Sequence, residues 1–319
     1  MTARVSPVVT PILQRRLILV LGKGGVGRST VAASIAAATA RAGRRTLLFE
    51  ANAKDRFGDF FGAPEVGPEI VKLRKNLFAV NTTPADALEE YGLMILRFRR
   101  VYKMVFENRI TEAFIKAIPG VEDYAILGKA WFHTKERKGG KPVWDTVVFD
   151  MAASGHSLAM LRIPWAITKT VPEGPLTRDA KEIQNLISDT EQTAIVMVTM
   201  AEDMPTNEAI DLAGQLDSHL GVSLSTVVVN QLYEDRFPER SPQAAVLSCL
   251  ETEKLSDGLT AIAEHGLQHR ARRKLGEHYL GRLKSALSAA QLHLPRLFVS
   301  RLGQDEIDSF SEKLSAELP

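Results

Sequence analysis

The sequence predicts an α/β fold with a mostly parallel sheet that helices flank on both faces. Short, nearly continuous apolar runs alternate with longer stretches of helical spacing, which is typical of strands buried on both sides. A glycine-rich segment joins the first apolar run to an alanine-rich stretch, which indicates a strand, a loop and a helix in that order. The apolar runs lie at residues 16–21, 45–50, 144–150, 193–199 and 225–230.

Two segments interrupt this alternation and read mostly as helix, at about residues 84–138 and 243–292. In the first, apolar residues such as Tyr91, Met94 and Phe98 recur at steps of three and four, which favours packing against the sheet. A chain of this length can bury one substantial core. We therefore expect a single domain over residues 1–319, with helical subdomain elements in these two segments.

The composition favours neither a nucleic-acid nor a membrane partner. The chain has 40 basic and 38 acidic residues, so its formal net charge of +2 creates no strong field. Its single cysteine, Cys249, allows no intramolecular disulfide and no set of zinc-binding thiolates, and we expect it to be a small buried residue on a helix. No stretch approaches the roughly 20 apolar residues that a membrane span needs. These features predict a cytoplasmic protein without a nucleic-acid partner and without stable membrane insertion.

A glycine-rich loop follows the first apolar run and fits the phosphate-binding pattern Gly-x-x-x-x-Gly-Lys-(Ser/Thr), except that Arg28 stands at the lysine position. Glycines allow a tight turn that brings backbone N–H groups close to phosphate oxygens at a helix N-terminus. Ser29 is the expected hydroxyl ligand of Mg²⁺, although a serine here also serves as a plain helix N-cap. The sequence thus predicts a P-loop site for nucleotide phosphates and Mg²⁺, and the family resemblance described below implies that the nucleotide is ATP. The expected phosphate-binding residues are Gly22, Lys23, Gly24, Gly25, Val26, Gly27, Arg28, Ser29 and Thr30.

Lys23 is additional to the generic pattern and indicates one branch of the P-loop proteins. The segment Lys-Gly-Gly-Val-Gly-Arg-Ser resembles the deviant Walker A loop of the ParA, MinD and ArsA group. That resemblance implies a face-to-face dimer in which Lys23 reaches the nucleotide of the other subunit. The dimer is expected to be a homodimer or a heterodimer with a paralogous P-loop ATPase.

Further segments resemble the ArsA family, which includes the ATPases that target tail-anchored proteins. The segment that begins at Asp150 is similar to the family's switch segment Asp-Thr-Ala-Pro-Thr-Gly-His-Thr-Leu, with Asp150 placed to hold a Mg²⁺-bound water. Within it, His156 is expected to link the switch to neighbouring backbone. Asn230 and Gln231 are similar to the family's adenine-recognition segment, in which the amide reads the base edge, and Pro295 belongs to a short stretch with the family's pattern.

The chain also departs from the family at residues that matter for hydrolysis. Asn52 stands where active members have the switch I aspartate, which leaves Glu50 as the nearest acidic residue upstream. An amide orients water but cannot accept its proton at neutral pH. Arg28 still pairs with phosphate, but with a different alignment from lysine. The resemblance therefore names Lys23, Arg28, Asn52 and Asp150 as the catalytic group and implies hydrolysis slower than in active relatives by about 10² to 10⁴.

Three functional hypotheses follow from these motifs. The leading one is a nucleotide-switched dimeric ATPase of the ArsA type that gates a protein partner or an apolar client. The second, which Arg28 and Asn52 motivate, is a regulatory or scaffold subunit that holds ATP, hydrolyses little and pairs with an active paralogue. The third is a positioning protein like ParA or MinD, which needs a basic DNA-binding surface or a membrane-binding tail. The basic clusters at residues 97–100 and 269–274 lie on expected helices and are interpreted as solvated faces.

Overall fold

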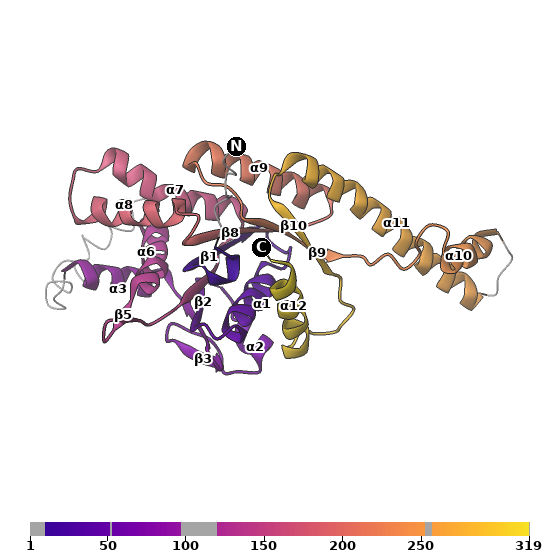
Figure 1. The fold of residues 1–319 in the computed structure, drawn as a ribbon, viewed down its shortest axis with the longest axis horizontal. Helices are drawn as coiled ribbons and strands as arrows, with labels where there is room; N and C mark the ends of the chain where they lie inside the picture. Colours follow the sequence, from indigo (N-terminus) through magenta and orange to yellow (C-terminus); the bar gives the residue numbers. More distant parts are fainter. Residues whose placement is uncertain (1–9, 52, 97–119, 253–256, 319) are drawn as a thin grey trace, which may run out of the picture.

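One large, mostly parallel sheet forms the centre of the molecule (Figure 1). The computed structural model describes residues 10–51, 53–96, 120–252 and 257–318. Within them the sheet has eight strands in the order β10-β9-β8-β1-β7-β2-β4-β3, and only β3 pairs antiparallel with its neighbour. Helices lie on both faces, so the predicted fold class is confirmed. The strands are β1 Leu17–Gly22, β2 Thr46–Ala51, β3 Val71–Arg74, β4 Leu77–Thr82, β7 Thr146–Asp150, β8 Thr193–Met200, β9 Thr226–Leu232 and β10 Ala290–Pro295.

Every expected strand is present. Three further strands, which lie at the ends of the sheet, were not predicted. The apolar runs form β1, β2, β7, β8 and β9, whose residues are almost all buried. The missed strands are β3 and β4 at one end and β10 at the other. β3 and β10 are edge strands whose residues are largely half-buried or exposed, so they lack the continuous apolar run on which the prediction relied.

Helices and a small hairpin complete the described chain. The hairpin pairs β5 with β6. The bounds of the helices and of the two hairpin strands are η1 Ile12–Gln14, α1 Arg28–Arg41, α2 Phe57–Phe61, α3 Pro84–Leu96, α6 Val121–Lys135, β5 Arg137–Lys138, β6 Lys141–Pro142, α7 Ser154–Thr170, α8 Pro175–Ser188, α9 Asp203–Leu220, α10 Pro242–Thr252, α11 Asp257–Ala286 and α12 Gln304–Glu317. Among the described helices, none combines the length and the apolar composition that crossing a membrane requires.

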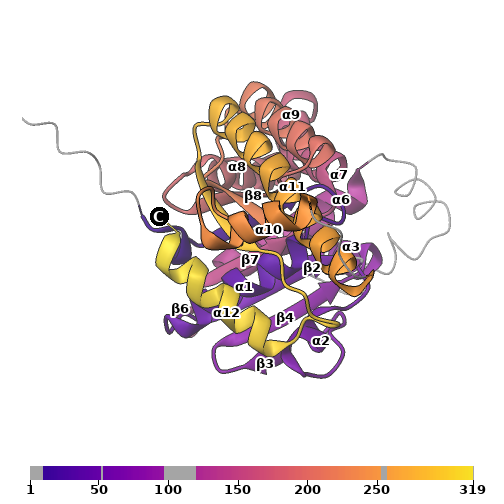
Figure 2. The ribbon, with the colours of Figure 1, turned by 90° about the vertical axis from the view of Figure 1, so that its right-hand side faces the viewer.

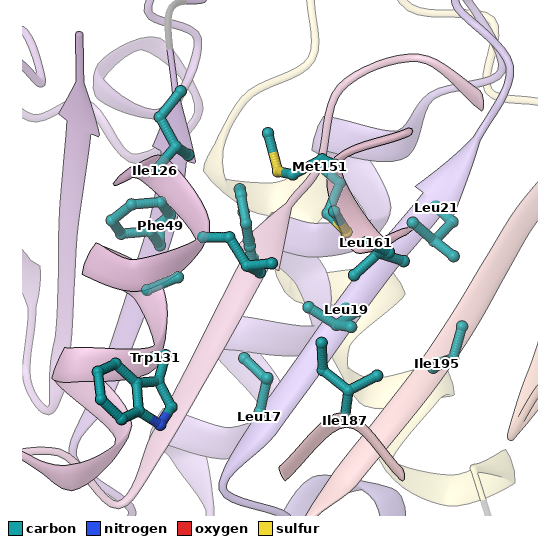
Figure 3. Packing of buried hydrophobic residues seen from close by; sticks show 14 of the residues in the cluster. Leu17, Leu19, Leu21, Phe49, Ile126, Trp131, Met151, Leu161, Ile187 and Ile195 are labelled. Carbon is teal, nitrogen blue, oxygen red and sulfur yellow. The ribbon is translucent and has the colours of Figure 1, made fainter. Parts of the chain in front are cut away.

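One face of the sheet packs against α6, α7, α8 and α9. Figure 3 shows alternate residues of β1, from Leu17 to Leu21, in the same apolar cluster as Trp131 of α6, Leu161 of α7 and Ile187 of α8. Side chains alternate between the two faces of a strand, so the intervening residues of β1 point to the other side. The central strand is therefore buried on both faces, as the continuous apolar run predicts.

The opposite face packs against α1, α2 and α12. Small alanine side chains allow α1 to lie close to the strands, and most of its residues are buried. The last helix, α12, lies alongside α1 (Figure 2) and adds Ile307, Phe310 and Leu314 to the same apolar cluster. Asp308 of α12 accepts hydrogen bonds from Arg41 at 3.2 Å and from Arg74 at 2.7 Å, which joins α12 to the end of α1 and to β3. The chain's last helix thus completes the core beneath its first long helix.

The described residues of the two segments expected to be helical are mostly helical, but each segment ends in strand residues, those of β5 and of β10. Residues 84–138 contain α3 and α6, while residues 97–119, with Phe98 and the basic cluster at 97–100, lie outside the described residues. Residues 243–292 contain α10 and α11, but their last residues begin β10, which corrects the expected end of this segment. That these helices act as subdomains stays a prediction.

The expected burial of Cys249 is wrong. Cys249 is exposed on α10. Figure 1 shows α10 and the far end of α11 projecting away from the sheet, and α10 packs mainly against α11. Its neighbour Val246 is 59% exposed for the same reason. An apolar residue on a projecting helix cannot reach the core.

Candidate functional site

The phosphate loop connects the end of β1 to the start of α1 through two glycines that accept no side chain. Gly22 has φ +152°, and a Cβ atom there would lie 2.2 Å from the carbonyl oxygen of Val198 on β8. Gly27, at φ +88°, precedes α1, and a Cβ atom there would lie 2.2 Å from Nδ2 of Asn230. The glycines of the motif therefore allow close approach of the neighbouring strands as well as a tight turn.

A hollow of about 420 Å³ opens beside this loop at the carboxyl edge of the sheet. Parallel strands end at the same edge, which is where α/β proteins bind ligands. The hollow contains the loop glycines, the expected magnesium ligands Ser29 and Asp150, and several charged side chains from the region after β2. Its lining residues are Gly24, Gly25, Gly27, Arg28, Ser29, Glu50, Ala51, Ala53, Lys54, Arg56, Asp150, Met151 and Ala152.

Asp150 and Glu50 are neighbouring acidic residues in the lining of the hollow. They are register partners on β7 and β2, and only 5% and 4% of their surfaces are exposed. Burial raises the pKa of Asp150, while a hydrogen bond with Ser29 and the positive charge of Arg28 oppose that rise. Burial, followed by the charge of Asp150, raises the pKa of Glu50 to about 8. This pair is electrostatically costly, which is typical of functional sites.

Arg28, which replaces the usual lysine, is half-buried at the first position of α1. Its Nη1 donates a hydrogen bond to the carbonyl oxygen of Gly22 at 3.2 Å. Burial lowers the pKa of Arg28, and the charges of Asp150 and Glu50 partly restore it. The guanidinium group is thus folded back over the first residue of its own loop.

Lys23 forms an ion pair with Glu208 of α9 in the same chain. The other carboxylate oxygen of Glu208 accepts a hydrogen bond from the hydroxyl of Ser154 at 3.1 Å. Ser154 is the first residue of α7, directly after the segment that resembles a switch. One carboxylate therefore connects the phosphate loop to the start of the switch helix.

The side chain of Asn230 contacts the phosphate loop. Its Nδ2 donates a hydrogen bond to the carbonyl oxygen of Val26 at 2.9 Å, so part of the amide is engaged by the loop. Gln231 and Pro295 lie on the adjacent strands β9 and β10, outside the hollow's lining, and Arg296 donates a hydrogen bond to Gln231 Oε1 at 3.3 Å. The residues expected to bind adenine thus gather at neighbouring strand ends next to the loop.

His156 contacts a side chain and not the backbone that we expected. Its Nε2 and Oδ1 of Asp123 on α6 lie 2.9 Å apart. Asn52 lies outside the described residues. Asp55, just beyond it, accepts hydrogen bonds from the backbone N–H groups of Phe57 at 2.8 Å and Val66 at 3.0 Å, so its carboxylate organises the local turn.

Sequence reasoning gave no site role to Glu50 or Glu208. Glu50 carries a recognisable signal, because it is a charged residue in an otherwise apolar strand run. Glu208 carries none, because it lies 185 positions from Lys23 along the chain and meets it only through the fold. Lys54 and Arg56, which line the hollow with Glu50, are exposed and follow β2.

A family model described as anion-transporting ATPase matches residues 15–173 and 175–254 of the chain. The chain belongs to the ArsA ATPase family. This membership agrees with the motifs at the phosphate loop and at Asp150, and it confirms the resemblance inferred from the sequence.

Several named ATPases of other organisms are similar to the chain. A putative arsenical pump-driving ATPase of Halobacterium salinarum is 29% identical over 254 residues, which cover 74% of this chain and 38% of that protein. ATPase BagA of Mycobacterium tuberculosis is 28% identical over 230 residues, covering 68% and 65%. ATPase GET3 of Kluyveromyces lactis is 25% identical over 260 residues, covering 70% and 74%. The matched part of the chain thus spans less than two thirds of the halobacterial and mycobacterial proteins.

The close approach of Asn230 to Gly27 predicts that alanine destabilises the protein more at Gly27 than at Gly25. Gly25→Ala places alanine at φ +90° with no atom within 4 Å of its Cβ, so it should lower the free energy of unfolding by about 1–2 kcal/mol. Gly27→Ala has a similar φ and also meets Asn230, so it should cost at least about 1 kcal/mol more. Urea unfolding measures both values. Equal losses, or no recovery when Asn230→Ala is added to Gly27→Ala, would contradict the contact.

The raised pKa of Glu50 predicts that stability falls with rising pH when no metal ion is present. The folded state keeps the proton up to a pKa of about 8, whereas the unfolded state loses it near 4.5, so the free energy of unfolding decreases between these pH values. Glu50→Gln should reduce that slope and raise stability at pH 8.5 by on the order of 2 kcal/mol. Urea unfolding in EDTA from pH 5 to 8.5 tests this. The exposed Glu69→Gln is the control, and identical slopes for Glu50→Gln and wild type would refute the prediction.

Proposed function

We propose that the chain is an ATP-binding, nucleotide-switched ATPase of the ArsA type that dimerises around ATP and gates a protein partner or an apolar client. The observation that carries the proposal is the hollow in which the phosphate loop, Arg28, Ser29 and Asp150 meet. Backbone N–H groups at the start of α1 suit phosphate oxygens, because the helix N-terminus is positive. Membership of the family supports ATP as the nucleotide.

Mg²⁺ is the metal ion that this donor set fits. Ser29 offers a hydroxyl oxygen and Asp150 a carboxylate, and Oδ1 of Asp150 is buried without a hydrogen-bond partner. A bound Mg²⁺ ion neutralises negative charge on the phosphates. Asp150 would hold and orient a water of that ion, while Ser29 fixes the end of the loop.

Hydrolysis is expected to be slow. Arg28 donates to the carbonyl oxygen of Gly22 and must leave that bond to reach a γ-phosphate oxygen. Asn52 can orient water but cannot take its proton. The attacking water oxygen would form a bond to the γ-phosphorus as the bond to the bridging oxygen breaks, with the proton passing to phosphate or solvent. These features also support the alternative, a subunit that holds ATP and regulates an active paralogue.

The ion pair of Lys23 suggests how nucleotide controls the switch. Lys23 would leave Glu208 to reach the nucleotide of the other subunit, and Glu208 would then lose one of the two groups it holds together. The start of α7 at Ser154 would respond first. An apolar hollow of about 440 Å³, with Tyr91 and Phe132 in its lining, supports an apolar client beside α3 and α6.

A single-turnover experiment tests the nucleotide chemistry. Purified protein mixed with γ-labelled ATP and Mg²⁺ should retain ATP and release phosphate slowly, and Asn52→Asp should release it about 10² to 10⁴ times faster. Retention without release by either protein would favour the ATP-holding regulatory subunit. No retention would refute the proposed function.

The Lys23–Glu208 contact predicts that substitutions of its two residues have opposite effects on nucleotide-dependent dimerisation. Glu208→Gln removes the competing carboxylate and should shift ATP-induced dimer formation to lower protein concentration by several-fold, because an exposed ion pair costs about 1 kcal/mol to break. Lys23→Ala should abolish ATP-induced dimerisation. Sedimentation velocity with a slowly hydrolysed ATP analogue measures both. Glu202→Gln, at an exposed residue before α9, serves as the control, and unchanged dimerisation in Lys23→Ala would contradict its role.

A further inference from the structure

Glu50 and Asp150 project into the same small space. They are register partners at the ends of β2 and β7. Leu48 and Val148, two positions earlier on the same strands, both pack into the apolar cluster beneath α1. Because side chains alternate along a strand, Glu50 and Asp150 emerge on that same face, on strands about 4.8 Å apart. Both side chains line the phosphate hollow.

The two carboxylates are incompletely satisfied. Oε2 of Glu50 and Oδ1 of Asp150 are each buried without a hydrogen-bond partner. The residues are 4% and 5% exposed, so water reaches them poorly. Burying a carboxylate without a partner is strongly unfavourable, and two such groups side by side also repel each other. Among the described residues, none supplies a hydrogen bond to either of these two oxygen atoms.

The nearby arginines do not supply such a bond. Nη1 of Arg28 donates to the carbonyl oxygen of Gly22, and Arg56 is exposed. Both act on Glu50 as neighbouring charges, with smaller effects than burial and Asp150. The carboxylate of Asp55 is engaged by backbone N–H groups, and its negative charge adds to the rise in the pKa of Glu50.

The side-chain atoms at this site that can bind a metal ion are all oxygen atoms. Two carboxylates and the hydroxyl of Ser29 suit a hard divalent cation such as Mg²⁺ or Mn²⁺, which binds proteins through one or two carboxylates and keeps several waters. The hollow of about 420 Å³ has room for those waters or for phosphate oxygens.

We propose that Glu50 and Asp150 together bind one divalent metal ion, and that they do so before nucleotide arrives. Glu50 is then a metal ligand supplied by the strand next to β7, in addition to the expected pair Ser29 and Asp150. The use of this ion in ATP chemistry rests on the proposed function, whereas its binding requires no nucleotide. The ion would be positioned beside the phosphate loop in advance.

Mn²⁺ binding to the full chain without nucleotide tests the proposal. Electron paramagnetic resonance follows free Mn²⁺ during titration of the wild type, Glu50→Gln, Asp150→Asn and the exposed control Glu69→Gln. We expect one bound ion per wild-type chain, with affinity at least about tenfold weaker in Glu50→Gln and in Asp150→Asn and unchanged in Glu69→Gln. Circular dichroism checks that each variant is folded, and Glu50→Gln is expected to be more stable than the wild type.

The outcomes separate this site from the proposed ATPase function. No Mn²⁺ uptake by the wild type, or equal affinity in wild type and Glu50→Gln, overturns the role of Glu50. A parallel titration with a fluorescent ATP analogue measures nucleotide binding in the same preparations. Mn²⁺ uptake that depends on Glu50 together with no binding of the analogue supports the metal site and contradicts the proposed function.

Discussion

The pairing of β1 with β7 on one side and β8 on the other is the constraint on which the site depends. All six residues of β1 are buried, and its end is set against the carbonyl oxygen of Val198. Only glycine fits at that point, so the chain turns away from the sheet there and begins the phosphate loop. The same pairing brings Asp150 to the edge beside the loop, and the next pairing brings Glu50 beside Asp150.

Side chains from distant parts of the chain fix the loop on both sides. Asn230 donates to Val26 within the loop, and Glu208 holds Lys23 near its start. The first contact is buried and joins β9 to the loop, so it is suited to a rigid support. The second is partly exposed and therefore weak, which suits a contact that changes during function. The loop is thus held by one buried contact and by one partly exposed contact.

The sequence predicts the central strands, the loop and Asp150 because their signals are local. A continuous apolar run identifies a strand buried on both faces, and the glycine spacing identifies the loop that follows β1. Edge strands such as β10 escape prediction because exposure on one side removes that run. The partnership of Glu50 with Asp150 and of Lys23 with Glu208 depends on which strands and helices are neighbours in space. Periodicity along the chain contains no information about that adjacency.

The packing of α12 has a consequence for the order of events during synthesis. The apolar face of α1 is completed by Ile307, Phe310 and Leu314 of α12, which the ribosome adds long after α1. Until they emerge, the helix that begins at the phosphate loop has part of its apolar surface exposed to solvent. Nascent chains of this protein therefore depend on α12 to bury a surface that forms earlier, and they are open to chaperone binding until α12 emerges.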